Sequence, residues 1–434
     1  MSHKPNILAV FAVAAAVVTV LATPLSAQCP VSEVRYTVID LGTLGGATSG
    51  ALDIDEAGRV VGTSATAAGV SHPFVWQNGV MTDLGTLGGP LGTGGAINAS
   101  GQVTGQSDNA ANIRRAYLYS DGEMIELPTL AGGEGRGFDL NDAGQVVGIS
   151  NSVSGWQHGF LYDHATGTIV DLGTLPGDNV SYANAINNAG QIAGWSSPVN
   201  NTSAARSYLL ENGEFVPLGT LGGTRSVAWD LDEAGRVVGW STLAGDAEFH
   251  GFLWDDGAMT DLGSLDGLPT VAAAAHAAGW VVGFSTTPAF AAQRAFVYRD
   301  GEMADLNSLI PPDSGWELVS AYGVNGVGQV VGTGRIGGST DARAFLASPA
   351  TVSVGQLSGL IQGFQLPDGI SNSLLAKLDN ALKSIEGCTP TGACTSFVAL
   401  TNEVEAQAGK KLTEEQAAAI LAAIATLEAT LGCS

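Results

Sequence analysis

The stretch Asp-Leu-Gly-Thr-Leu-Gly-Gly at residues 40–46 decides the fold, because it returns unchanged at 83–89 and in looser form as far as residue 310. A second phrase of the form Gly-x-Val-Val-Gly keeps the same period, and its seven copies start 43 to 49 residues apart. These copies lie at 58–62, 101–105, 144–148, 190–194, 235–239, 279–283 and 328–332. A repeat of this length is typical of a ring or stack of similar structural units.

Each repeat contains four short β-rich runs, which we label A to D in chain order. Turn residues separate them: Asp55–Gly58 between A and B, and Asn78-Gly79 between C and D, both followed by similar turns in later repeats. Four strands joined by such turns are typical of a propeller blade. The B–C and D–A connections are expected to be longer, about eight to ten residues, and to share one face of the ring.

The count of strands predicts how the ring closes. The chain begins with a lone D strand, Arg35–Leu41, and its last repeat, Ala321–Ala347, has A, B and C without D. Pairing the two removes the open edge. We therefore predict an all-β, seven-bladed β-propeller over residues 31–349, closed by its N-terminal strand and followed by a small three-helix domain.

Residues 35–347 resemble the bacterial family of extracellular HAF repeats. The matching features are the 40–46 phrase, the Asn-x-x-Gly-Gln-Val-Val-Gly cores at Asn141–Gly148 and Asn325–Gly332, and the His/Arg-small-Phe motifs. The His-Ala-Phe signature is degenerate here, as at His72-Pro-Phe. The resemblance implies secretion and a repeat fold, and it implies no particular activity.

The N-terminal 27 residues are predicted to be a signal peptide. His3 and Lys4 precede an apolar run, Ile7–Ala22, and cleavage is expected near Ala27. The run is short and rich in alanine, so it does not predict a membrane span. We expect a secreted, extracellular or periplasmic protein.

Charge excludes several classes of partner. Residues 31–349 hold 33 Asp and Glu against 12 Arg and no Lys, a net charge of 12 − 33 = −21. Nucleic acids and anionic membranes attract basic surfaces, so neither is an expected partner. The five lysines fall outside this range, four of them beyond residue 376, which places a domain boundary near 349.

Residues 350–434 are predicted to form the helical module. A helix opens at Ser371 or Ser373 and stops before Gly387, a second spans Cys394–Ala408, and a capping box at Thr413–Gln416 opens a third. Residues 353–434 resemble a FIMAH-type module through Leu366–Ile370, Ser373–Leu378 and Gly409–Thr413. The resemblance implies an accessory or attachment role.

Four cysteines in an exported chain predict two disulfides. Antiparallel packing of the last two helices favours Cys394–Cys433, which leaves Cys29–Cys388. Other connectivities stay open. A metal site is disfavoured, because Cys-x5-Cys without a nearby His is poor zinc spacing, and we expect no metal and no cofactor.

Aromatic residues follow strand B in three consecutive repeats, at Trp195, Trp240 and Phe284, and Trp156 lies in a neighbouring B–C connection. We refer to these four residues as the aromatic arc. Such rings suit stacking on sugars or apolar chains. The alternative is that they pack between blades.

Histidine begins strand C in the repeats whose strand A carries aspartate. The pairs are Asp53 with His72, Asp139 with His158 and Asp230 with His250. An Asp–His pair can act as a general base, but three copies around a ring favour a structural brace.

No motif identifies a catalytic residue. Our first prediction is therefore a monomeric, non-enzymatic binding propeller that recognises an extracellular glycan, polymer or surface protein on the long-loop face, through the aromatic arc. The alternatives are a secreted hydrolase or lyase that uses one Asp–His pair, and a structural scaffold for protein partners.

Overall fold

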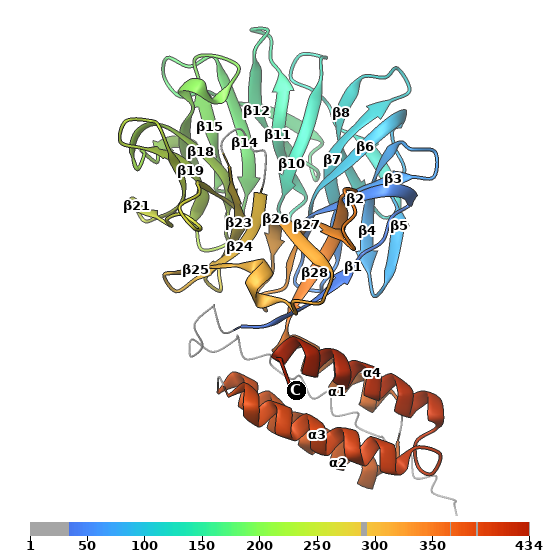
Figure 1. Ribbon diagram of the computed structural model, residues 1–434. Coiled ribbons are helices and arrows are strands. Elements are labelled where there is room, and N and C mark those ends of the chain that lie inside the picture. The colour runs from blue at the N-terminus through green and yellow to red at the C-terminus, as the bar shows by residue number, and fades with distance from the viewer. Residues whose placement is uncertain (1–33, 288–292, 365, 388, 434) are drawn as a thin grey trace, which may run out of the picture.

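The computed structural model describes residues 34–287, 293–364, 366–387 and 389–433. Seven four-stranded antiparallel sheets form a ring, and four helices follow them (Figure 1). The chain is thus a seven-bladed β-propeller with a helical C-terminal module. The predicted signal peptide and the predicted Cys29–Cys388 bridge fall outside the described residues.

Blades 1 to 6 each run outwards in sequence order, from strand A to strand D. Blade 1 has β2 (Gly45–Ile54), β3 (Val60–Thr66), β4 (Ser71–Gln77) and β5 (Val80–Asp83), and blade 2 has β6 (Gly88–Ile97), β7 (Val103–Asn109), β8 (Arg114–Ser120) and β9 (Glu123–Glu126). Blade 3 has β10 (Gly135–Leu140), β11 (Gln145–Asn151), β12 (Gln157–Asp163) and β13 (Thr168–Gly173), and blade 4 has β14 (Val180–Ile186), β15 (Ile192–Ser197), β16 (Arg206–Glu211) and β17 (Glu214–Pro217). Blade 5 has β18 (Gly222–Leu231), β19 (Val237–Leu243), β20 (Phe249–Asp255) and β21 (Ala258–Asp261), and blade 6 has β22 (Thr270–His276), β23 (Trp280–Thr286), β24 (Gln293–Arg299) and β25 (Glu302–Asp305).

Blade 7 joins the two ends of the propeller. Its strands are β26 (Trp316–Val324), β27 (Val330–Ile336) and β28 (Arg343–Pro349), with β1 (Tyr36–Asp40) as the outermost strand. β1 pairs antiparallel with β28 from Tyr36 opposite Pro349 to Asp40 opposite Phe345. This pairing gives blade 7 its fourth strand from the opposite end of the propeller sequence.

The first strands of neighbouring blades contact one another, so they line the central channel. We call the side with the A–B and C–D turns the turn face, and the side with the B–C and D–A connections the loop face. The connections on the loop face are shorter than the predicted eight to ten residues in blade 1, where β3 ends at Thr66 and β4 begins at Ser71. Long A strands likewise shorten D–A connections: β2, β6 and β18 have 10 residues each.

The recurring 40–46 phrase ends strand D and carries the chain to the next blade. In the copy at 83–89, Asp83 Oδ1 accepts a hydrogen bond from the amide of Gly85 at 2.8 Å. Gly85 has φ +74°, which a glycine adopts without strain. The amide of Leu87 then donates to Ser107 Oγ at 3.0 Å, which fixes the phrase to the strands of blade 2.

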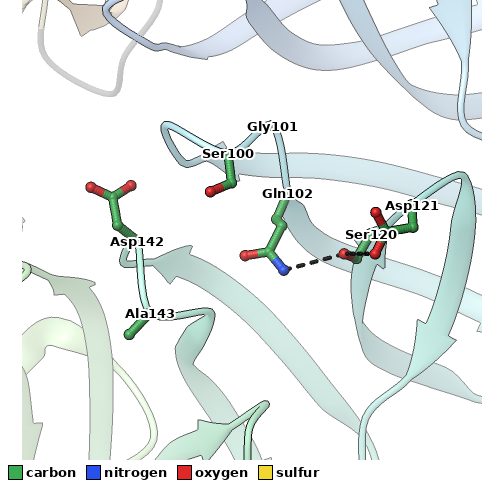
Figure 2. A pocket seen from close by; sticks show the side chains of 7 residues that line it. All are labelled: Ser100, Gly101, Gln102, Ser120, Asp121, Asp142 and Ala143. Atoms are coloured by element: carbon green, nitrogen blue, oxygen red, sulfur yellow. Dashed lines mark hydrogen bonds between the residues drawn. The ribbon is translucent and has the colours of Figure 1, made fainter.

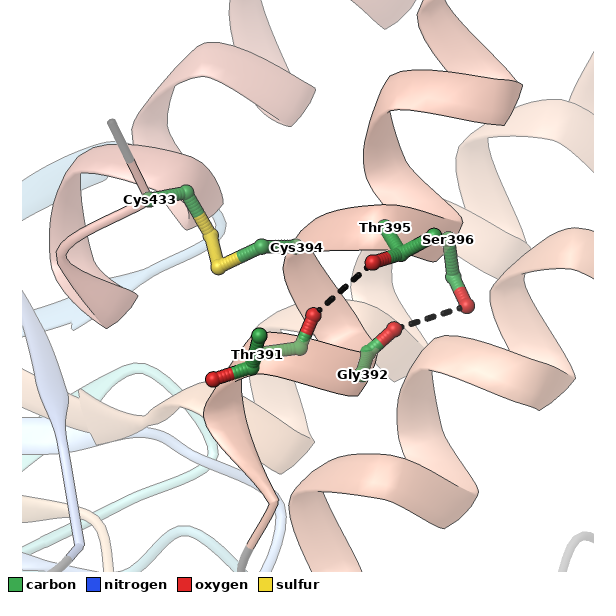
Figure 3. The surroundings of a disulfide bond; sticks show 6 residues. All are labelled: Thr391, Gly392, Cys394, Thr395, Ser396 and Cys433. Atoms are coloured by element: carbon green, nitrogen blue, oxygen red, sulfur yellow. Dashed lines mark hydrogen bonds between the residues drawn. A yellow bond between two sulfur atoms is a disulfide. The ribbon is translucent and has the colours of Figure 1, made fainter.

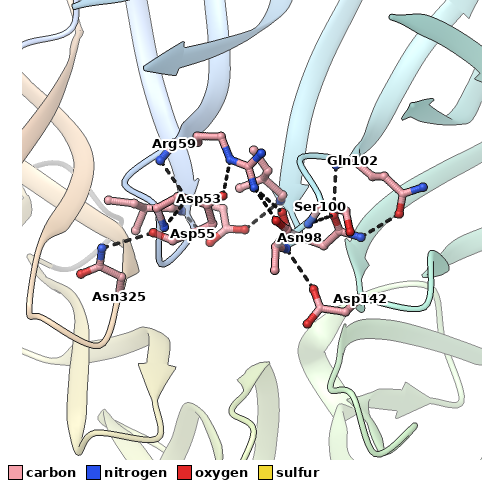
Figure 4. Close-up of polar contacts among 12 residues, drawn as sticks. Asp53, Asp55, Arg59, Asn98, Ser100, Gln102, Asp142 and Asn325 are labelled. Atoms are coloured by element: carbon pink, nitrogen blue, oxygen red, sulfur yellow. Dashed lines mark hydrogen bonds and ion pairs between the residues drawn. The ribbon is translucent and has the colours of Figure 1, made fainter. Parts of the chain in front are cut away.

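Hydrogen bonds between A–B turns tie the blades together on the turn face (Figure 4). Asn325 Nδ2 donates to the carbonyl of Asp55 at 3.2 Å, which links blade 7 to blade 1. Arg59 Nη2 donates to the carbonyls of Asn98 at 3.3 Å and Ala99 at 2.7 Å, which links blade 1 to blade 2. Asn98, Asn141 and Asn187 each donate in the same way to the following turn. The turn-face ends of the blades are therefore fixed relative to one another.

The C-terminal module has four helices rather than the expected three: α1 (Ala350–Gly363), α2 (Asp368–Glu386), α3 (Pro390–Gln407) and α4 (Glu414–Leu431). Sequence reasoning missed α1, which begins immediately after strand β28 and has no side-chain cap at its start. The capping box at Thr413 and Gln416 is confirmed at the start of α4. Apolar residues from all four helices form one core.

A disulfide joins Cys394, in the first turns of α3, to Cys433, just after α4 (Figure 3). The Cα atoms lie 5.4 Å apart and the residues are 39 apart in sequence. This bridge was predicted from the antiparallel packing of the last two helices, and it is confirmed.

The double substitution Cys394→Ser/Cys433→Ser is expected to lower the stability of the helical module by at least about 2 kcal/mol, because the unfolded segment regains the entropy that the cross-link removes. Hydrogen exchange read by mass spectrometry checks this on the full chain. Peptides from α3 and α4 should exchange faster, while peptides from blade 3 should not change. Equal exchange with and without the bridge would contradict the expectation.

Candidate functional site

Each blade has one bulged residue in strand A, and the seven bulged residues lie at one level of the ring. In every pair of A and B strands the register shifts by one position, and the extra residue lies on strand A. These residues are Leu52, Gly95, Phe138, Asn184, Trp229, Ala273 and Tyr322. A bulge re-aims a side chain that regular pleating would direct elsewhere. The repeat thus brings seven variable positions, one of them a glycine, to the same level of the ring.

Six of the seven bulged residues line a cavity of about 480 Å³ in the channel. Phe138, Trp229 and Tyr322 supply aromatic surface, and Asn184 supplies an amide. Residues just before the bulges, such as Thr93, complete the wall on the loop-face side. The cavity is large enough for part of a small ligand and has both apolar and hydrogen-bonding surface, which are the usual features of a binding site.

Three carboxyl groups lie one residue deeper along strand A, toward the turn face: Asp53, Asp139 and Asp230. Each carboxyl bonds the amide that follows it and an amide of the next blade. The bonds to the next blade are Ile97 N to Asp53 at 2.9 Å, Ile186 N to Asp139 at 2.7 Å and Ala275 N to Asp230 at 2.8 Å. The carboxyls thereby join blades 1 and 2, 3 and 4, and 5 and 6.

The surrounding strands take these carboxyls away from bulk water, although each side chain keeps partial exposure within the channel. Burial raises the pKa of Asp53 to about 6 and the pKa of Asp230 to about 7. Burial also raises the pKa of Asp139 well above its usual range, and repulsion from Asp230 and Asp53 adds to this. The amide hydrogen bonds oppose the rise, but burial outweighs them. Asp53 and Asp230 can therefore hold and release protons near neutral pH, and burial favours the protonated form of Asp139.

The predicted Asp–His pairs are not formed. His72 Nδ1 lies 2.9 Å from Asp83, His158 Nδ1 lies 2.9 Å from Asp171, and His250 Nδ1 lies 2.8 Å from Asp261. These partners stand on strand D of the same blade, whereas Asp53 and its equivalents point to the next blade along the channel. In other blades an arginine takes the histidine's place, as in Arg115 with Glu126 at 2.8 Å. The histidines are part of a brace that recurs on the loop-face side of several blades.

The four residues of the aromatic arc differ in solvent exposure. Trp195 is 7 % exposed and stacks on Tyr182 with 4.2 Å between ring centroids, and Phe284 is 3 % exposed. Trp240 is half-buried beside Phe249 at 5.5 Å, and Trp156 is 40 % exposed. Trp195 and Phe284 thus pack within the propeller, as the structural alternative expected. A binding role for the exposed part of the arc stays a prediction.

A second cavity, of about 310 Å³, lies on the turn face between blades 2 and 3 (Figure 2). Polar side chains dominate its wall, among them Gln102, Asp121 and Asp142. Gln102 donates to Ser120 at 3.2 Å, and Asp142 accepts the amide of Ala99 at 2.9 Å. These side chains are engaged in holding the turns together, so the channel is the stronger candidate. Within the described ranges no group of three His, Cys, Asp or Glu side chains is placed to hold a metal ion.

Sequence reasoning found the three aspartates but missed the aromatic lining of the channel. Phe138 and Trp229 directly precede Asp139 and Asp230, and Leu52 precedes Asp53. Regular alternation along a strand places adjacent residues on opposite faces, so the position before each aspartate reads as a packing position. The seven bulges change this, and a bulge has no reliable signal in a single sequence.

Comparisons with solved structures return propellers. TolB from Acinetobacter baumannii matches with 13% identity and a TM-score of 0.38, over 57% of this chain and 64% of its own. The β-propeller domain of the Trilobed protease from Pyrococcus furiosus matches with 10% identity and a TM-score of 0.47, over 69% and 95%. An oligogalacturonate lyase in complex with manganese matches with 12% identity and a TM-score of 0.47, over 73% and 96%.

Other similar structures are longer than the matched region. The chain spans 51% of a puromycin hydrolase mutant, which it matches with 14% identity and a TM-score of 0.45. It also spans less than two thirds of TolB. No protein-family model matches the chain, and no curated protein matches it. The resemblance to HAF repeats and to a FIMAH-type module therefore stays a prediction.

The prediction of a non-enzymatic binding propeller is contradicted. The similar propellers that were found include those of a protease, an oligogalacturonate lyase and a puromycin hydrolase, besides TolB. At identities of 10–14% these similarities concern the fold and assign no reaction. The form of the hydrolase or lyase alternative also changes, since its Asp–His pairs are absent from the described residues. No described helix is long and apolar enough to cross a membrane.

Proposed function

We propose that the chain is an exported hydrolase or lyase that performs general acid–base catalysis in its central channel. The observation that carries this proposal is the set of three channel carboxyls, Asp53, Asp139 and Asp230, with raised pKa values beneath an aromatic-lined cavity. A carboxyl group with a raised pKa beside a cavity is a candidate for proton transfer.

The carboxyls can divide the roles of acid and base. Mutual repulsion opposes the ionisation of all three at once, so near neutral pH a protonated and an ionised carboxyl coexist. The protonated group gives its proton to the leaving atom. The ionised group takes a proton, from water in a hydrolysis or from carbon in an elimination. Either route returns the set to its starting protonation state, because one proton enters as another leaves.

Export is supported by two features of the chain. The first 27 residues have the pattern of a signal peptide, and the Cys394–Cys433 disulfide suits an oxidising compartment. We propose that the protein acts outside the cytoplasm, in the periplasm or beyond the cell.

The test is a substrate screen with glycosidic, ester and peptide substrates, run on the full chain and on Asp53→Asn, Asp139→Asn and Asp230→Asn. Loss of a general acid or base is expected to lower kcat by about 10²-fold or more. The rate should fall as pH rises through about 6–7, where the acid loses its proton. Asp261→Asn serves as the matched control, because Asp261 is an aspartate of blade 5 that pairs with His250 outside the channel. Equal rates in the folded channel variants and in wild type would contradict the proposal.

A further inference from the structure

The channel cavity adjoins a third cavity, and together they form a groove across the loop-face side of blade 2. The third cavity has a volume of about 160 Å³ and shares Thr93 and Gln106 with the channel cavity. Its outer end is formed by Ser71 of blade 1 and by Asp108 and Arg114 of blade 2. We call the two cavities together the blade-2 groove. An elongated ligand could lie in it with one end in the channel.

In blade 2 the two side chains where the cavities meet are polar and carry no ring. Thr93 lies opposite Gln106 in the sheet, and the equivalent pair in blade 4 is Tyr182 opposite Trp195. The blade 4 rings stack with centroids 4.2 Å apart and fill the corresponding space. Blades 5 and 6 also carry a ring at the position of Gln106, Trp240 and Phe284. The fold accepts a large ring at this position, so its absence from blade 2 is a property of this sequence.

Gln106 carries an unused hydrogen-bond acceptor beside the groove. Its Oε1 atom is enclosed by the protein and accepts no hydrogen bond from the described residues. The Gln106 side chain lines both cavities at the point where they meet. The rest of the Gln106 side chain is partly exposed, so a rotation of its amide toward the cavities would let a ligand hydroxyl donate to Oε1 without displacing a protein donor.

Charge decides against an anionic ligand. The whole chain has a formal charge of −24, and the side chains that directly follow the bulges in blades 1, 3 and 5 are Asp53, Asp139 and Asp230. One cation, Arg136, lies two residues before the bulge of blade 3. At the outer end, Arg114 Nε lies 3.8 Å from Asp108 Oδ1, so the two charges offset each other. The groove therefore favours an uncharged ligand along most of its length.

We propose that the blade-2 groove binds an uncharged oligosaccharide, with one sugar ring against Phe138, Trp229 or Tyr322 in the channel and the next units over Thr93 and Gln106. Sugar rings present C–H groups to aromatic faces and hydroxyls to amide oxygens, which matches this combination of side chains. The inference rests on the proposed function, since it names the substrate class of the channel carboxyls.

The experiment compares wild type with Gln106→Trp, which introduces the residue that blade 4 carries at this position. Isothermal titration calorimetry measures binding of xylohexaose, cellohexaose and the hexamer of N-acetylglucosamine, with a basic peptide and a uronate oligomer as other ligands. Gln106→Trp is expected to weaken binding of the bound hexasaccharide at least ~10-fold. Val153→Trp is the matched control, because Val153 is 92 % exposed and an added ring there leaves the groove unchanged.

Gln106→Ala covers the case in which Gln106→Trp does not fold, since it removes the acceptor without adding volume. Binding of no hexasaccharide, equal binding by wild type and both Gln106 variants, or binding of the peptide alone would overturn the groove assignment. Turnover of the bound hexasaccharide is also measured, on wild type and on Asp230→Asn. This measurement separates the groove assignment from the proposed function. Sugar binding that depends on Gln106, with no turnover by wild type, would support the groove assignment and contradict the proposed reaction. Turnover of another substrate class at a rate that Gln106→Trp does not change would support the proposed reaction and contradict the groove assignment.

Discussion

Asp139→Ala is expected to lower the free energy of unfolding by about 2–5 kcal/mol, because two buried backbone amides lose their acceptor and each costs about 1–3 kcal/mol. The amide of Leu140 donates to Asp139 at 2.8 Å, and the amide of Ile186 in blade 4 donates at 2.7 Å. Leu140 and Ile186 are each 5 % exposed, so water is a poor substitute. Removal of the buried carboxyl recovers part of this lost free energy. The upper end of the expected range is therefore below the sum of the penalties for the two amides.

Denaturant unfolding at pH 6 measures this effect. Alanine fits the site sterically, since Ala185 occupies the equivalent position in blade 4. The matched control is Asp83→Ala, whose carboxylate is exposed and bonds Gly85 and His72. An exposed pair of this kind contributes about 0–1 kcal/mol. If the two variants lost equal stability, Asp139 would not join blades 3 and 4 in the way that its contacts indicate.

Stability should fall as pH rises from 5 to 8, by on the order of 3 kcal/mol, because each pKa unit corresponds to about 1.4 kcal/mol. The pKa of Asp53 is raised to about 6 and that of Asp230 to about 7, above the value of 3.8 for a free aspartate. Between those values the folded state binds more protons than the unfolded state. The stabilisation is therefore complete below about pH 4 and is lost as pH passes through 6 to 7.

The remaining carboxylates repel one another, which also lowers stability as pH rises. The test therefore compares the slopes of stability against pH between variants. Asp230→Asn should show a shallower loss of stability between pH 5 and 8 than wild type. Asp261→Asn removes the same formal charge from an exposed site of the same blade, and it should keep the wild-type slope. Thermal unfolding at several pH values checks both. Parallel curves for all three proteins would contradict the raised pKa of Asp230.

The hydrogen bonds in the channel explain why aspartate and alanine alternate along strand A from blade to blade. Aspartate occurs in strand A of blades 1, 3 and 5, and alanine stands at the same position in blades 2, 4 and 6. One carboxyl has two oxygens and serves two amides, its own blade's and the next blade's, so a second aspartate has no amide left to bond. Because the number of blades is odd, strict alternation of aspartate and alanine cannot continue around the whole ring. Blade 7 carries Gly323 at this position, where an added Cβ would lie 3.0 Å from the Cα of Asp53. The histidine that accompanies each aspartate in sequence belongs to a separate pair.

The sequence by itself determined the period and the number of blades and favoured the Cys394–Cys433 bridge, because these depend on turn residues, strand patterns and helix spacing along the chain. Tertiary structure alone decided which side chains meet in the channel. A one-residue bulge in each strand A turns Phe138, Trp229 and Tyr322 inward, and the register between neighbouring blades places Asp139 on the amide of Ile186 rather than on His158. Contacts of this kind depend on register across blades, and a shift of one residue reverses the direction of every side chain on a strand.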